Sequence, residues 1–119
     1  MSSLSASTPA ADDRNAVWEH CRNALGIARL LVQEGRSADL VDTACYLAVE
    51  SACRVALEQA DLAYDGDPGR ALGWLAAPRG LWPLPVDGNA HDRLRAAERV
   101  VGWLATYLKS EAPHHSWGY

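Results

Sequence analysis

Apolar side chains recur every three or four positions along two neighbouring segments of the chain, residues 13–34 and 37–62. This spacing puts them on one face of an α-helix, so the pattern predicts two long amphipathic helices. Gly35 lies between the segments, and glycine readily adopts the left-handed conformation in which many helices end. We therefore expect a hairpin in which the second helix folds back against the first.

Small residues line the expected inward face of the second helix and let two helix backbones approach closely. Asp12 or Asp13 is expected to begin the first helix and Ser37 the second, because these side chains accept hydrogen bonds from free backbone N–H groups. The pattern therefore predicts tight packing within the hairpin. The small inward residues are Ala44, Cys45, Ala48, Ser51 and Ala52.

The second half of the chain predicts one short helix and one long helix. Asp67, followed by a proline, is a typical N-cap and predicts a short helix over residues 69–77. Asn89 predicts the start of a long helix over residues 90–109. The connection between them is rich in proline and glycine but also carries apolar residues, so we expect it to pack on the core and close one end of the bundle.

These elements predict an all-α fold, an up-and-down bundle of three long helices and one short helix. The chain of 119 residues is long enough for one domain with one core. We expect this domain to span residues 13–110, after a disordered leader at 1–12 and before a flexible tail at 111–119.

Charge and apolar content limit the possible partners and the compartment. The net charge is −4, and ten of the eleven basic residues are arginines scattered along the chain, so we expect no extended nucleic-acid surface. A local arginine-lined pocket for phosphate stays open. No run of about 18 apolar residues occurs, so we expect no membrane span. The first residues lack the features of a secretory signal, which predicts a cytoplasmic protein.

The cysteines and histidines predict no metal site and no cofactor. Three cysteines, Cys21, Cys45 and Cys53, fall on expected helices, and an odd number argues against a disulfide framework. We interpret them as small core residues. No HExxH or CxxC pattern occurs, and the adjacent His114 and His115 are expected to be solvated.

Tryptophan is frequent here, with five residues in a chain that has no phenylalanine. The simplest interpretation is that tryptophan supplies the bulky side chains of the core. The alternative is that Trp74, Trp82 and Trp103 line an apolar pocket for a small ligand near the long connection.

The stretch LGIARLLVQEGRSADLVDTACYLAVESACRVALE resembles the first helical hairpin of HEPN domains. The resemblance extends over residues 16–108, although its specific part is the hairpin. It implies a HEPN-like four-helix bundle. That family includes ribonuclease toxins, partners of nucleotidyltransferases and members without known catalysis. The residues that carry the resemblance are Ala44, Tyr46, Leu47, Ala48, Ala52, Ala56 and Leu57.

Catalytic HEPN domains carry an arginine, four to six intervening residues and then a histidine, generally near the final helix. The arginines of the final helix are followed by no histidine at that distance. Arg14 and His20 have this spacing, but they lie at the start of the first helix, which is the wrong place for the family pattern. The resemblance therefore favours a non-catalytic member.

Three functions follow from these observations. The first is a non-catalytic, HEPN-like interaction module that forms a homodimer and works with a nucleotidyltransferase-like protein or a nucleotide ligand. The second is a metal-independent ribonuclease in which His20 is the general acid or base and Arg14 stabilises the phosphate charge. The third is a helical bundle that binds a small ligand between Trp74, Trp82 and Trp103.

Overall fold

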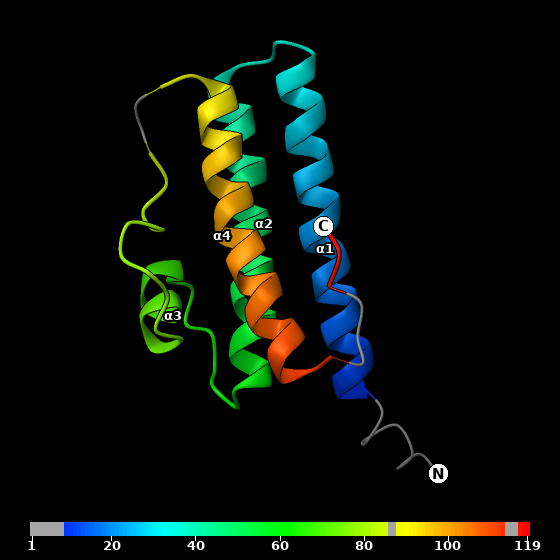
Figure 1. Ribbon diagram of the computed structural model, residues 1–119. Helices are drawn as coiled ribbons and strands as arrows, with labels where there is room; N and C mark the ends of the chain where they lie inside the picture. The colour runs from blue at the N-terminus through cyan, green and yellow to red at the C-terminus, as the bar shows by residue number, and fades with distance from the viewer. Residues whose placement is uncertain (1–8, 86–87, 114–116) are drawn as a thin grey trace.

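The computed structural model describes residues 9–85, 88–113 and 117–119, and for 9–13 only the helical backbone (Figure 1). This part of the chain is helical with no strand, so the predicted all-α fold is confirmed. Its helices are α1 (Pro9–Gln33), α2 (Ala38–Gln59), α3 (Pro68–Trp74) and α4 (Ala90–Glu111).

The central helix is α2, which packs against both α1 and α4, whereas α1 and α4 touch each other far less (Figure 1). The short α3 packs against α2 as well. α1 and α2 run antiparallel, and α3 with the following connection returns the chain so that α4 runs parallel to α2 (Figure 1). An ion pair of 2.5 Å between Asp42 and Arg93 joins the first turns of α2 and α4.

Small residues form the core between the helices of the hairpin, as the sequence predicts. Most of the small residues expected on the inward face of α2 are buried, while Ser51 is half-buried. α1 contributes Ala24 and Ala28, which are also buried. α1 and α2 share the largest contact between any two helices of the described chain. The buried small residues of α2 are Ala44, Cys45, Ala48, Ala52, Cys53 and Ala56.

α1 begins earlier than the sequence analysis predicts. It starts at Pro9, so Asp12 and Asp13 lie inside the helix, and residues 9–12 belong to α1 and not to a leader. Proline suits a first helical position because its missing N–H would have no partner there. The apolar repeat starts only at Val17. It therefore predicts the turns of α1 that face the core, but not the turns between Pro9 and Val17. Residues 1–8 lie outside the described chain.

Three helix ends use a residue in the left-handed conformation. Gly35 ends α1 with a φ of 69°, as expected. α2 ends at Gln59 and α3 at Trp74, each three residues before its expected end, because Asp61 and Ala76 adopt φ values of 61° and 58°. Non-glycine residues adopt this conformation at a cost, so neither residue type predicts a helix end at these two positions.

The N-caps predicted for α2, α3 and α4 lie where expected, but only two of the three use their side chains. The Asp67 carboxylate accepts hydrogen bonds from the backbone N–H groups of Gly69 and Arg70, at 3.0 and 3.3 Å. The Asn89 side chain accepts from the N–H of Asp92 at 2.9 Å. Ser37 is the N-cap of α2, but its hydroxyl makes no cap hydrogen bond.

The connection before α4 packs on the core but does not close an end of the bundle. Leu75, Leu81, Trp82 and Leu84 are half-buried against the core. The connection runs along the side of α2 and α4 toward the start of α4 (Figure 1). The expected position at one end is therefore wrong, because the chain must travel back along the helices before α4 begins.

The end of the chain differs most from the sequence analysis, which predicts a flexible tail. Trp117 is buried with an exposed fraction of 2%, and its indole packs edge-on against Trp18 of α1 with ring centroids 5.4 Å apart. The Trp18 indole N–H donates to the carbonyl of Gly118 at 2.9 Å, and the Trp117 indole N–H donates to the carbonyl of Ala112 at 2.9 Å. The adjacent histidines 114 and 115 lie outside the described residues.

The tail joins α4 to α1, which otherwise touch little. Arg29 of α1 donates to the carbonyl of Tyr119 at 2.9 Å and forms an ion pair of 2.8 Å with Glu98 of α4. The Tyr119 hydroxyl lies so close to Gly102 of α4 that a Cβ atom there would meet it at 2.6 Å. The buried Trp117 indole thus anchors the tail. The spacing of apolar residues does not predict this, because the tail is short and mostly polar.

We expect the Trp117→Ala variant to lose about 3–5 kcal/mol of unfolding free energy, because a fully buried indole leaves a cavity. Urea denaturation followed by circular dichroism measures the loss. Trp74→Ala is the control, since Trp74 is 51% exposed, and it should change the free energy by less than about 1 kcal/mol. Equal losses of unfolding free energy in the two variants would contradict the burial of Trp117.

Candidate functional site

Arg14 and His20 do not come together within one chain. Both lie on α1, six residues apart, and at 3.6 residues per turn their side chains point about 120° apart. The Arg14 guanidinium donates to the Gln59 side-chain oxygen at 2.6 Å, at the end of α2, whereas His20 is exposed. This placement supplies no acid–base pair for phosphoryl chemistry within a single molecule.

The three candidate pocket tryptophans have different surroundings. Trp82 is half-buried beside Tyr46, with ring centroids 6.0 Å apart, and it lines a hollow of about 210 Å³ with Pro83, Leu84 and Pro85. Trp74 is 51% exposed on α3. Trp103 stacks on Tyr107 of the same helix with centroids 6.1 Å apart. Neither Trp74 nor Trp103 lines the hollow at Trp82.

The three cysteines are buried, free thiols, as expected for small core residues. Burial raises the pKa of Cys21 to about 12, of Cys45 to about 11 and of Cys53 to about 12. Because the thiolate is the nucleophilic form, these groups are unreactive at neutral pH. Among the described residues, no group of three or more histidine, cysteine, aspartate or glutamate side chains is placed to hold a metal ion.

Four large aliphatic side chains of the hairpin are about half exposed, and we call them the α1–α2 aliphatic face. Ile27 and Leu30 of α1 are 55% and 52% exposed. Leu40 and Leu47 of α2 are 45% and 52% exposed. The core side of α2 carries mainly alanine, cysteine and valine, and these two leucines lie outside it.

Helix geometry places this face on the side of the hairpin away from α4. Arg29 and Asp42 reach toward α4, because they form ion pairs with side chains of that helix. Ile27 and Leu40 each precede one of these residues by two positions, which turns them by about 200° around their helices. α1 and α2 are antiparallel and joined at residues 34–37, so positions equally far from the turn are neighbours. Ile27, Leu30 and Leu40 therefore lie in the half of the hairpin nearer the turn, and Leu47 lies near the middle of α2.

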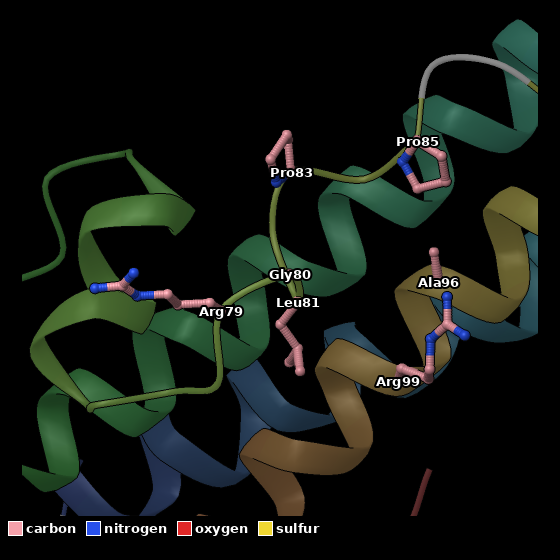
Figure 2. A pocket seen from close by; sticks show the side chains of 7 residues that line it. All are labelled: Arg79, Gly80, Leu81, Pro83, Pro85, Ala96 and Arg99. Atoms are coloured by element: carbon pink, nitrogen blue, oxygen red, sulfur yellow. The ribbon is translucent and has the colours of Figure 1, made fainter.

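A second candidate region is a hollow of about 270 Å³ between the connection and α4 (Figure 2). Gly80, Leu81, Pro83 and Pro85 come from the connection, and Ala96 and Arg99 come from α4. Leu81 points toward α4, while the Arg99 side chain runs beside Ala96 toward Pro85 (Figure 2). The lining is mainly apolar, and the Arg99 guanidinium lies at its edge (Figure 2).

In comparisons with known proteins, the chain matches no family model, no curated protein and no solved structure. The HEPN resemblance thus stays a prediction that rests on the hairpin residues. Within the described residues, no helix has the length and apolar character needed to cross a membrane.

We expect the unfolding free energy to fall as the pH rises above 9, the ordinary pKa of a cysteine thiol. In the folded chain Cys53 keeps its proton to about pH 12, so between these values the unfolded state alone loses the proton and is favoured. Below pH 9 this contribution is constant. Each buried thiol can cost up to about 1.4 kcal/mol per pH unit.

Urea denaturation at pH 8, 9 and 10 measures this slope. The Cys53→Ala variant should have a shallower slope above pH 9 than the natural chain. Ser51→Ala changes a neighbouring half-buried side chain that does not titrate, so it should leave the slope unchanged. The same slope in the natural chain and in Cys53→Ala would contradict the assignment.

Proposed function

We propose that the chain is a non-catalytic helical interaction module that forms a homodimer through the α1–α2 aliphatic face. The observation that carries this proposal is the exposure of Ile27, Leu30, Leu40 and Leu47, each 45–55%, on one side of the hairpin. Single exposed leucines are common on monomers, whereas a group of large aliphatic side chains is typical of an interface.

The energetics of this face favour a weak dimer. Burying the exposed half of one leucine or isoleucine contributes roughly 1 kcal/mol, so eight such side chains from two copies contribute about 8 kcal/mol. Association costs about 4–15 kcal/mol of lost translational and rotational freedom and side-chain ordering. At the lowest of these costs about 4 kcal/mol remains, which corresponds to a dissociation constant of about 1 mM. The aliphatic face alone thus supports a dimer only near millimolar concentrations or above, unless polar contacts at its rim add to it.

The surroundings of the candidate catalytic groups support a binding role over a hydrolytic one. Arg14 and His20 point in different directions on α1, and the three thiols are buried and protonated at neutral pH. RNA cleavage that disappears in the His20→Ala variant would contradict a non-catalytic role.

The HEPN resemblance extends the proposal. It implies a nucleotidyltransferase-like protein or a nucleotide as the functional partner, in the cytoplasm. The proposed functional partner rests on the hairpin sequence, and the proposed homodimer rests on the exposed side chains. Co-purification with a nucleotidyltransferase tests the partner, and the molar mass in solution tests the homodimer.

We expect light scattering after size-exclusion chromatography to give a mass that rises from 12.9 kDa toward twice that value as the concentration approaches the millimolar range. The Leu47→Arg variant should stay monomeric, because a charged guanidinium replaces an apolar side chain of the aliphatic face that is 52% exposed. Trp74→Arg introduces the same charge at another exposed apolar side chain and should still dimerise. A monomeric natural chain at about 1 mM would refute the proposed dimer.

A further inference from the structure

Six of the ten arginine side chains contact another side chain, and most of the remaining four lie together beside α4. Among the described residues, the side chains of four arginines make no ion pair or hydrogen bond, namely those of Arg36, Arg79, Arg95 and Arg99. Three of these four line two hollows on α4, and Arg99 lines both. The six arginines with partners are Arg14, Arg22, Arg29, Arg54, Arg70 and Arg93.

The larger of the two hollows has a volume of about 530 Å³ and is positively charged. Arg95 and Arg99 lie one turn apart on α4, where like charges repel each other. Glu98 lines the same hollow, but its carboxylate is held by Arg29 at 2.8 Å and so does not neutralise them. Tyr119 brings a phenol hydroxyl to the hollow over Gly102. Two adjacent guanidiniums without a counter-charge favour an anion between them.

The smaller hollow, of about 270 Å³, adjoins this charged one through Arg99 (Figure 2). Leu81, Pro83, Pro85 and Ala96 give it mainly apolar walls. Arg79 also lines it, but its guanidinium extends to the far side of the connection from Arg99 (Figure 2). The pair of hollows therefore offers a charged half and an apolar half with one arginine between them.

We infer that Arg95 and Arg99 bind the phosphate group of a small phosphorylated ligand whose apolar part lies against Leu81, Pro83 and Pro85. A phosphate monoester carries close to two negative charges at neutral pH and matches two guanidiniums, whereas a carboxylate matches one. The net charge of −4 disfavours a long polyanion, so the ligand is a small molecule and not a nucleic acid. This site is independent of the α1–α2 aliphatic face.

Isothermal titration calorimetry of the full chain with phenyl phosphate tests the site, with inorganic phosphate and phenol as the two fragments. We expect phenyl phosphate to bind more tightly than either fragment. The Arg99→Gln variant should weaken that binding about tenfold or more, because charge-assisted hydrogen bonds are lost. Arg95→Gln should weaken it in the same way.

Arg36→Gln is the matched control, because Arg36 is also exposed and without an ion pair but lines neither hollow. Its affinity for phenyl phosphate should stay within twofold of the natural chain. No heat of binding with 10 mM phenyl phosphate would overturn the inference. Equal weakening by Arg36→Gln and Arg99→Gln would also overturn it, since the attraction would then be unspecific. Circular dichroism verifies that each variant is folded, and the mass in solution tests the dimer separately.

Discussion

The close packing of α1 on α2 through small side chains is the contact on which the rest of the structure depends. Ala44, Ala48 and Ala52 are buried along α2, and Ala28 is buried on α1. Side chains of this size let the helix axes approach closely, and the densely packed interior that results leaves little room for larger groups. α2 then serves as the central helix against which α1, α3 and α4 are arranged.

This choice of small inward residues also determines what lies on the surface. Leu40 and Leu47 are carried on the outer side of α2, where they remain about half exposed. On the other side, α1 and α4 meet only weakly, so the gap is bridged by the ion pair of Arg29 with Glu98 and by the buried Trp117. The aliphatic face and the arginine-lined hollows lie on different helices.

The sequence was sufficient for the hairpin, the short third helix and most of the caps, because these follow from local signals such as apolar spacing and capping residues. It was insufficient for the end of the chain, since the burial of Trp117 depends on a gap that exists only once α1 and α4 are in place. Arg14 and His20 have the spacing of the arginine and histidine in catalytic HEPN domains, but their side chains point in different directions on α1. The sequence leaves an arginine-lined pocket for phosphate open but does not single out Arg95 and Arg99, because their lack of counter-charges is a property of the folded chain.

The unfolding free energy of the Ala48→Leu variant tests the central contact most directly. Ala48 is fully buried on the inward face of α2, so three extra carbon atoms must push α1 and α2 apart. The account predicts a loss of about 1–3 kcal/mol, whereas Thr43→Leu on the exposed side of the same helix should change the free energy little. An Ala48→Leu variant as stable as the natural chain would contradict it.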